Sequence, residues 1–226
     1  MKKILVTSGG TQEYIDDFRI LTNISSGALG ALTAEKLADA GMEVFFIGSK
    51  SSVMPNLPHR FHIEVIRSVS DAMAMMEKVI KENEIDAVVH AMAVSDFTFI
   101  KNKDIKCKST DPEAFIDYMR QTIAVNPKII SKIKQWRPET TLIGFKFEIG
   151  LALEELVDLA EASIDRNGCD LVIANDKKEM KELHRHAAHF VYSEKMRNQH
   201  YLTNCTAYDK TDIAEKIVSF LEKVYE

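Results

Sequence analysis

Residues 6–30 read VTSGGTQEYIDDFRILTNISSGALG and hold four of the nine glycines in this 226-residue chain. A short apolar run at residues 3–8 predicts a β-strand that ends at the first glycine pair, and SSGALG opens a helix expected over residues 27–40. A strand, a glycine-rich connection and a helix in this order are typical of one unit of a sheet with parallel strands.

Outward from this unit, apolar runs rich in Val, Ile and Phe alternate with longer segments of helical period. Such alternation indicates strand–helix units around a parallel sheet. Ser70 with Asp71 is expected to cap the second helix, and Gly41 to end the first. Further strands are predicted at 43–49, 62–68, 86–93, 141–147 and 170–176, and further helices at 70–83, 127–136 and 151–167.

After residue 176 the alternation breaks. Residues 189–194 and 200–205 resemble an antiparallel strand pair, and Thr211 is expected to cap a final helix. The predicted fold class is therefore α/β, a Rossmann-like, doubly wound and mainly parallel sheet with an antiparallel C-terminal edge. Because no Pro-, Gly- or Ser-rich linker divides the chain, residues 1–226 are expected to form a single nucleotide-binding domain.

The formal net charge of −5 gives no basic footprint that would attract nucleic acid or an anionic membrane, so a small-molecule partner is expected. No apolar run approaches the roughly 20 residues that span a bilayer, and the N-terminus becomes polar too early for a signal peptide. The three cysteines are scattered without CxxC spacing, as in proteins with reduced thiols. We therefore expect a cytoplasmic protein.

The two glycine clusters make the N-terminal segment a candidate anion site. Glycine lacks the Cβ that would hold a phosphate away from backbone amides, and a helix N-terminus adds unpaired amides and positive dipole. The same glycines would also serve a simple strand-to-helix turn, and by themselves they leave both interpretations open. The candidate nucleotide-binding residues of this segment are Gly9, Gly10, Thr11, Ser25, Gly27 and Gly30.

Familiar nucleotide motifs fit this segment poorly. It has no GxGxxG, and the second strand ends in IGSK, without the acidic residue that bonds a ribose hydroxyl in dinucleotide-binding folds. The chain has neither the GxxxxGK[ST] of a P-loop nor the YxxxK of a short-chain oxidoreductase. An NAD(P)-dependent oxidoreductase on a similar fold and a non-catalytic nucleotide sensor are therefore the less favoured alternatives.

The segment QEYIDDFRILTN, residues 12–23, separates the two glycine clusters. It would place Glu13, Asp16, Arg19 and Asn23 near whatever the glycines hold. Arg19 suits an anion, and Asn23 offers both a donor and an acceptor. The insertion therefore favours a substrate-recognition site over a simple turn.

The whole opening resembles the signature of the phosphopantothenoylcysteine synthetase family, in which GGT, E, ID, R, and N with SSG and a further G recur in this order. The resemblance continues through nearly the whole chain. The later stretches that resemble family segments are AVSDF at 93–97, DIKCK with Lys106, NPKII at 126–130, IGFKFE at 143–148 and DLVIAND at 170–176.

The resemblance implies a ligase of coenzyme A biosynthesis. In such an enzyme a nucleoside triphosphate, CTP or ATP, with Mg²⁺ activates the carboxylate of 4'-phosphopantothenate as an acyl-nucleotide and releases pyrophosphate. The amine of L-cysteine then forms the amide. The resemblance also implies a homodimer in which each site is completed across the interface.

Residue by residue, the resemblance implies that Asn23 holds the carbonyl of the acyl intermediate with Arg19 in support. Lys106 would serve the triphosphate and the activation step. The other residues that it matches to the nucleotide are Asp96, Pro127 and Phe145.

The sequence also departs from the family. Ser163 and Asn167 stand where bacterial members carry two lysines that reach the triphosphate, which leaves the choice between CTP and ATP open. Many members are fused to a flavin-dependent decarboxylase, and we expect that partner to be a separate chain, because Met1 leads directly into the first strand. The nearby histidines of HRHAAH, residues 184–189, favour a polar loop over a metal site, so no protein-held metal is expected.

Overall fold

The structure is a computed structural model that describes residues 1–100 and 110–226. The described residues form an eight-stranded sheet in the order β12-β11-β10-β9-β6-β1-β4-β5. The strands from β10 to β5 in this order are parallel neighbours, whereas β11 and β12 pair antiparallel at the other edge. The strands are β1 (Lys3–Ser8), β4 (Glu43–Ser49), β5 (His62–Ile66), β6 (Ala87–His90), β9 (Thr141–Glu148), β10 (Leu171–Asp176), β11 (Ala188–Tyr192) and β12 (Cys205–Ala207).

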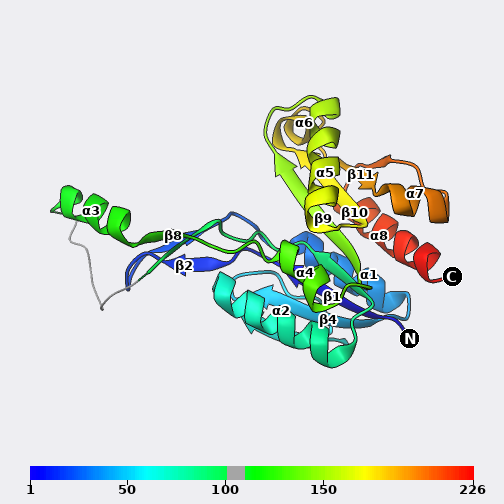
Figure 1. The fold of residues 1–226 in the computed structure, drawn as a ribbon, viewed down its shortest axis with the longest axis horizontal. Coiled ribbons are helices and arrows are strands. Elements are labelled where there is room, and N and C mark those ends of the chain that lie inside the picture. Colours follow the sequence, from blue (N-terminus) through cyan, green and yellow to red (C-terminus); the bar gives the residue numbers. More distant parts are fainter. Residues whose placement is uncertain (101–109) are drawn as a thin grey trace.

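Helices cover both faces of this sheet, because the central strands carry buried apolar side chains on both sides (Figure 1). Leu5 and Val88 belong to the core under α2, α4 and α5, and their neighbours Val6 and Val89 to the core under α1 and α8. The doubly wound, mainly parallel α/β fold is therefore confirmed. These helices are α1 (Ala28–Asp39), α2 (Val69–Asn83), α4 (Ile130–Trp136), α5 (Leu153–Asn167) and α8 (Lys210–Tyr225).

Two helix caps differ from the predicted ones. Ser68, not Ser70, caps α2, because its hydroxyl accepts from the Asp71 amide at 3.1 Å and the Asp71 carboxylate accepts from the Ser68 amide at 2.9 Å. Asp209 rather than Thr211 caps α8. Both errors arose where several cap-forming residues stand within one turn of each other, so that composition alone does not choose among them.

The antiparallel C-terminal edge is confirmed, but its second strand begins later than predicted. Residues 194–200 form a short helix, α7 (Glu194–His200), and β12 begins only at Cys205. The signal for α7 is Ser193, whose hydroxyl accepts from the Met196 amide at 3.3 Å. A further short helix, α6 (Lys177–Glu182), follows β10 directly and was also missed.

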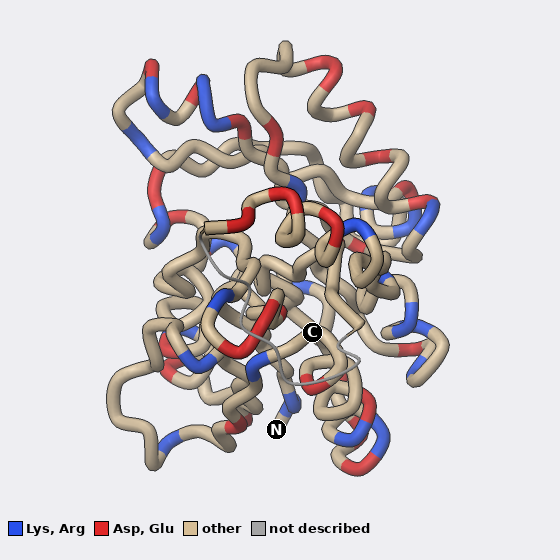
Figure 2. Tube along the Cα trace, turned by 90° about the vertical axis from the view of Figure 1, so that its left-hand side faces the viewer, with Lys and Arg blue, Asp and Glu red and all other residues tan. Residues whose placement is uncertain are grey.

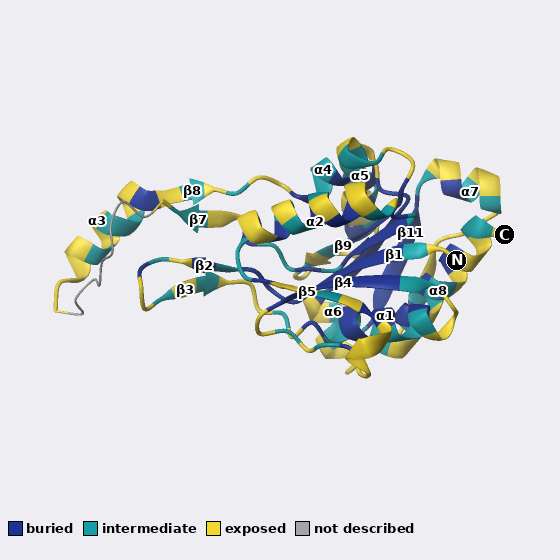
Figure 3. Ribbon diagram, turned by 90° about the horizontal axis from the view of Figure 1, so that it is seen from below, coloured by how far each residue is buried: buried dark blue, intermediate teal, exposed yellow. Residues whose placement is uncertain are grey.

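A long arm projects from the α/β body (Figures 1 and 3). We define the arm as residues 12–22, 97–100 and 110–125. The sequence did not predict it, because strands of three residues leave almost no periodic signal. Its elements are the antiparallel pair β2 (Gln12–Tyr14) and β3 (Ile20–Thr22), the antiparallel pair β7 (Phe97–Phe99) and β8 (Ile123–Val125), and helix α3 (Pro112–Thr122).

Buried polar contacts attach the arm to the body. The carboxylate of Glu13, 6% exposed, accepts from the Val69 amide at 2.7 Å and from the Thr98 hydroxyl at 2.6 Å. Glu13 therefore joins β2 to α2 and β7, and it does not project toward the glycines as expected. A buried carboxylate with two good donors is a stable arrangement, whereas an unpaired one would be costly.

Charges are interspersed over the molecule, with Lys and Arg close to Asp and Glu on the same elements (Figure 2). Among the residues that the structure describes, no helix has the length and apolarity required to cross a membrane.

Candidate active site

A cavity of about 390 Å³ lies at the carboxyl ends of the central parallel strands, and we call it the α1 cavity. Its lining comes from the start of α1, the loop after β6 and the ends of β9 and β10. Open α/β sheets bind ligands at this end of the strands. Of the residues predicted from sequence, Ser25, Gly27, Gly30 and Phe145 line the cavity.

The N-terminus of α1 faces the α1 cavity, and no acidic side chain of the helix's first turn lies there. Gly27 caps the helix with φ 74°, supplies no side-chain hydrogen bond, and is followed by a first turn without acidic residues. Only the Ala28 amide has a hydroxyl partner near it, Ser26 Oγ at 3.4 Å. The remaining amides and the helix dipole favour a bound anion here.

Lys210 and His186 add basic chemistry to the α1 cavity. Lys210 is the first residue of α8, and both side chains belong to the lining. Burial, and to a lesser degree the charge of Lys210, lower the pKa of His186, which favours a neutral imidazole beside the Lys210 ammonium. The described lining contains no Asp or Glu that would neutralise it. Sequence reasoning missed both roles, because only the fold brings these residues beside residues 24–30.

The surroundings of the glycines bear on the two alternatives left open by the sequence, a strand-to-helix turn and an anion site. A Cβ on Gly9, which has φ +82°, would lie 2.2 Å from Ser49 Oγ, and one on Gly30 would lie 2.4 Å from Ser8 Oγ. Both positions are therefore needed for close backbone packing. Gly30 in addition lines the α1 cavity, so its role in packing is compatible with the predicted anion site.

Gly10 and Thr11 connect the loop after β1 to the loop after β6. Gly10 forms a parallel bridge with Ala93, and the Thr11 hydroxyl accepts from the Ser95 amide at 2.9 Å. A Cβ on Gly10 would lie 2.3 Å from the carbonyl oxygen of Asn23. Gly10 and the fully buried Thr11 are not part of the described cavity lining. Their contacts instead hold in place the loops that do line the cavity.

Asn23 and Arg19 lie at opposite ends of β3. Asn23 stands at the base of the arm, where its Nδ2 donates to the Val94 carbonyl at 3.0 Å. Arg19 stands at the tip, paired with Asp16 and 4.9 Å from the centre of the Phe115 ring. Four residues of extended chain place their Cα atoms about 13 Å apart. Asp16 is fully buried in this tip and, like Glu13, has a structural partner set instead of facing the glycines.

A second cavity of about 170 Å³, which we call the α4 cavity, adjoins the first, because Met92 and Phe145 line both. It lies beside the start of α4 and is lined by two further predicted residues, Asp96 and Pro127. Asp96 pairs with Lys128 from the same lining. The fold thus brings Asp96, Pro127 and Phe145 together from three separate segments.

The remaining predicted positions lie elsewhere. Lys106 lies outside the described residues. Ser163 and Asn167 are near the end of α5, where Asn167 Nδ2 donates to the Ser163 carbonyl at 3.0 Å. Because α5 ends just before β10 begins, these two positions lie at the opposite end of the sheet from both cavities.

The histidines of residues 184–189 have separate surroundings. His189 contacts Glu179 at 2.9 Å and Thr206 at 3.1 Å, whereas His186 faces the α1 cavity. Among the described residues, no three His, Cys, Asp or Glu side chains come together as a metal site would require. The interpretation of this segment as a polar loop was therefore incomplete for His186, which has a place in the candidate site.

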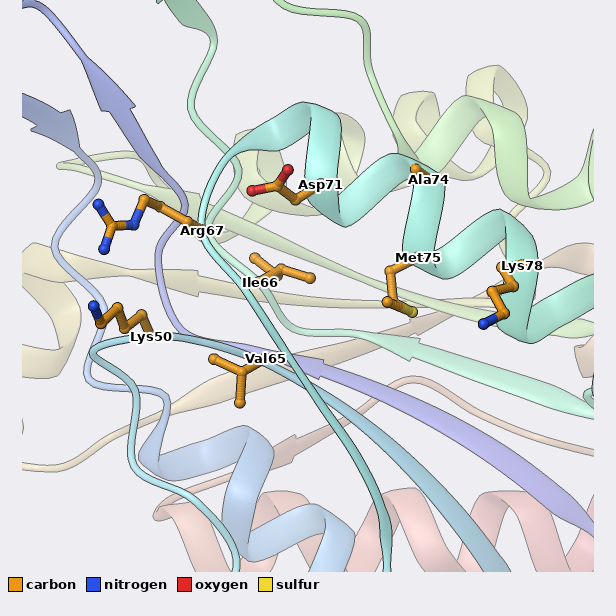
Figure 4. Close-up of a pocket in the computed structure, with 8 residues that line it drawn as sticks. All are labelled: Lys50, Val65, Ile66, Arg67, Asp71, Ala74, Met75 and Lys78. Atoms are coloured by element: carbon orange, nitrogen blue, oxygen red, sulfur yellow. The ribbon is translucent and has the colours of Figure 1, made fainter.

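A further cavity, of about 510 Å³, lies between the edge strand β5 and α2 (Figure 4). Lys50, Arg67 and Lys78 surround its apolar floor. The start of α2 nearby is already satisfied, since the Val69 amide donates to Glu13 and Ser68 caps the helix. This cavity therefore lacks the free helix N-terminus of the α1 cavity, which is the better candidate for the active site.

Comparison with known proteins decides the family. Residues 1–225 match the family described as the DNA/pantothenate metabolism flavoprotein C-terminal domain. The chain belongs to this family. The family resemblance inferred from the glycine-rich opening is thereby confirmed.

Relatives of this flavoprotein domain family include longer proteins. The chain is 42% identical over 178 residues to the coenzyme A biosynthesis bifunctional protein CoaBC of Thermococcus kodakarensis, a match that covers 78% of this chain and 42% of that protein. The CoaBC protein of Methanocaldococcus jannaschii is 27% identical over 223 residues, covering 98% and 51%. The chain thus spans about half, or less, of the length of these relatives.

A solved structure of similar length confirms the fold. The DNA/pantothenate metabolism flavoprotein from Streptococcus pneumoniae is 32% identical, has a TM-score of 0.82, and is covered over 100% of both chains.

Proposed function

We propose that this chain is a phosphopantothenate–cysteine ligase of coenzyme A biosynthesis. The observation that carries the proposal is the α1 cavity, where the free N-terminus of α1 and Lys210 meet with no described carboxylate, in a member of this family. The CoaBC relatives are named for coenzyme A biosynthesis. A structure of the same fold, 17% identical with a TM-score of 0.72, is described as a complex with phosphopantothenate-cysteine.

The cavity has the chemistry that acyl-nucleotide formation requires. The substrate carboxylate attacks the α-phosphorus, the bond to the bridging oxygen breaks, and pyrophosphate leaves with the electron pair. Negative charge accumulates on the phosphate oxygens, and preorganised amides with a fixed cation stabilise it. The α1 amides and Lys210 provide these groups, and no nucleophile from the protein is needed.

The second step joins cysteine to the activated acyl group. The amine attacks the acyl carbon, the nucleoside monophosphate leaves, and the ammonium proton is lost. We assign Asn23 to the acyl carbonyl. One N–H of its side-chain amide donates to the Val94 carbonyl, which fixes the orientation of the amide, and the second N–H is the donor that we assign to the substrate. Val94 itself lines the α4 cavity, which supports this assignment, although Asn23 is not part of the described lining of either cavity. By resemblance, Lys106 is assigned to the triphosphate.

We propose CTP as the nucleotide, with ATP as the alternative, and Mg²⁺ as the accompanying ion. Because the described lining of the α1 cavity offers no carboxylate, the ion would enter bound to the triphosphate oxygens. When bound there, Mg²⁺ neutralises phosphate charge. The phosphates would lie at Ser25, Gly27 and Gly30, and the nucleoside beside Asp96, Pro127 and Phe145.

The arm supports a homodimer. Large apolar side chains are exposed along it, as at protein–protein interfaces. We propose that two arms pair and that Arg19, at the arm tip, acts in the partner's site while Asn23 acts in its own. We further propose that residues 1–226 form one catalytic unit and act in the cytoplasm. The exposed apolar residues of the arm are Tyr14, Phe18, Ile20, Phe97, Ile100, Ile116, Ile123 and Val125.

A coupled assay tests the activity. The protein is incubated with 4'-phosphopantothenate, L-cysteine and Mg²⁺, with CTP or ATP in separate reactions, and pyrophosphate release and product mass are measured. We expect pyrophosphate and 4'-phosphopantothenoylcysteine in equal amounts, with the higher rate for CTP. A control without cysteine should stop after about one equivalent of pyrophosphate per site. Absence of pyrophosphate with both nucleotides contradicts the proposal.

A further inference from the structure

His90 is a buried histidine that the proposed chemistry leaves without a role. It is the last residue of β6, lies opposite Thr7 of β1, and is 7% exposed. Side chains alternate along a strand, so His90 shares the face of Val88, which is the face covered by α4. The imidazole accordingly lines the α4 cavity, together with Asp96 and Asn126.

The hydrogen bonds of Thr7 determine which ring nitrogen carries the proton. Thr7 Oγ1 accepts from the Met92 amide at 3.3 Å and lies 2.9 Å from His90 Nδ1. Thr7 is fully buried, so its own hydroxyl proton needs an acceptor. His90 Nδ1 is the acceptor within reach, and a neutral imidazole that accepts at Nδ1 carries its proton on Nε2.

The Nε2–H group therefore has no protein partner among the described residues, although the ring is more than nine-tenths buried. Burial lowers the pKa of His90 from 6.5 to about 4, so the ring stays neutral at physiological pH. Because His90 lines the α4 cavity, this unpartnered donor is open to the cavity and available to a ligand there.

A complementary acceptor lies in the same cavity. Asn126 Nδ2 donates to the Ser95 carbonyl at 3.1 Å, which fixes the amide and leaves its Oδ1 as the acceptor on the other side. Because Met92 and Phe145 line both cavities, a nucleotide with its phosphates at α1 can extend its nucleoside into the α4 cavity. Nucleobase edges carry donors and acceptors side by side.

We infer that His90 donates its Nε2–H to the nucleoside part of the bound nucleotide and thereby positions it. This inference rests on the proposed ligase function, and it adds a residue to the nucleoside side of the site. Thr7 is the residue that holds the required tautomer. The phosphate side of the site, at α1 and Lys210, does not depend on His90.

Two substitutions separate the donor from the Thr7 contact. His90→Asn keeps a polar group near Thr7 but removes the distal N–H, and His90→Gln restores an amide N–H near the Nε2 position. Binding of CTP, ATP and inorganic tripolyphosphate is measured by calorimetry with the full chain, after thermal unfolding has shown that each variant is folded.

We expect His90→Asn to weaken nucleotide binding about fivefold, the size of one hydrogen bond, and His90→Gln to recover most of it. Tripolyphosphate affinity should stay the same in both variants. Equal nucleotide affinity in wild type and His90→Asn overturns the role of His90 while the ligase function stands. Equal losses for nucleotide and tripolyphosphate also overturn it, since they indicate a general structural effect. A wild type that binds no nucleotide overturns the role together with the proposed function.

Nitrogen NMR of histidine-labelled wild-type protein checks the tautomer without any substitution. We expect a protonated Nε2 and an unprotonated Nδ1 for His90, and a shift of the Nε2–H signal when CTP is added. A protonated Nδ1, or an Nε2–H signal that saturating nucleotide does not move, overturns the inference.

Discussion

At the scale of single residues, Lys210 acquires its role from position rather than from neighbours in the sequence. It begins a C-terminal helix, yet its side chain lines the cavity built by residues 24–30. Its charge has no described acidic partner in that lining. A lysine ammonium is a compact charge suited to phosphate oxygens, and in a partly closed site its interaction is only weakly screened.

Lys210→Gln should therefore weaken nucleotide binding, because a hydrogen bond to a charged group contributes about 1.5–3 kcal/mol. We expect the KM for CTP to rise at least tenfold in the pyrophosphate assay, and tripolyphosphate affinity to fall by a similar factor. The matched control is Lys195→Gln, an exposed lysine on α7 outside both cavities, which should retain wild-type values. An unchanged KM in Lys210→Gln would contradict the assignment.

The buried His90 should make the free energy of unfolding depend on pH. Its pKa is about 4 in the folded protein and 6.5 in the unfolded chain, so between these values only the unfolded chain binds the proton. The free energy of unfolding should therefore fall as pH decreases from 6.5 to 4, by on the order of 3 kcal/mol in total. Urea unfolding of wild type and His90→Asn at several pH values measures this. The difference between the two should be constant above pH 7 and should shift in favour of the variant below pH 6; parallel curves would refute the account.

At the scale of elements, the contact between β1 and α1 explains why glycines recur in this segment. Helix α1 packs directly over the end of β1, and Gly30 stands where a side chain would meet Ser8. The same close approach brings the helix N-terminus to the cavity at the end of the strand. The close packing and the proposed anion site therefore follow from one geometry.

Gly30→Ala tests this packing. Alanine is the better helix former by about 1 kcal/mol, but its Cβ would lie 2.4 Å from Ser8 Oγ and 2.7 Å from Ser8 Cβ. We expect the overpacking to dominate and the variant to lose about 1–3 kcal/mol of unfolding free energy, measured with urea. The double variant Ser8→Gly with Gly30→Ala removes both contacting atoms and should recover part of the loss. A single variant more stable than wild type would show that helix propensity dominates.

At the scale of the whole molecule, the arm stands out because it buries little of its own apolar surface (Figure 3). The α/β body has two cores, one on each face of the sheet, whereas the arm consists of two-stranded pairs and one helix. Two-stranded ribbons are marginally stable by themselves. Pairing with a second arm would cover these exposed residues.

Val125→Asp tests the dimer. Val125 lies on β8 and is 75% exposed, so a carboxylate there should leave the monomer folded but disrupt an apolar interface. We expect wild type to sediment as a dimer at micromolar concentration and Val125→Asp to dissociate at least tenfold more readily. Val65→Asp is the matched control, because Val65 is also exposed, at 56%, but lies on the edge strand β5 outside the arm. A monomeric wild type, or equal dissociation in both variants, would contradict an arm-mediated dimer.

The sequence predicted the body of the fold well, because each of its elements has a local signal. Strands such as β1 and β4 were placed at their observed bounds, since buried parallel strands are continuous apolar runs. The arm was missed because three-residue strands have no usable period. Part of the candidate site was found from the opening signature, whereas Lys210, His186 and His90 were not, because nothing beside them in the chain marks them.

By itself, the sequence determined the alternation of strands and helices, the parallel sheet, the glycine-rich turn and the family, since all of these depend on residues close together in the chain. The tertiary structure alone decided that Lys210 joins the cavity, that Glu13 supports the arm, and that Asn23 and Arg19 lie at opposite ends of β3. It also brought Thr7, 83 residues away in the chain, within hydrogen-bond distance of His90, the contact from which we infer the tautomer of His90. The physical reason is that charge, burial and tautomer depend on which groups the fold brings within hydrogen-bond distance. The same consideration applies to VTSGGTQEYIDDFRILTNISSGALG, whose glycines allow close packing and in part line the cavity of the proposed anion site.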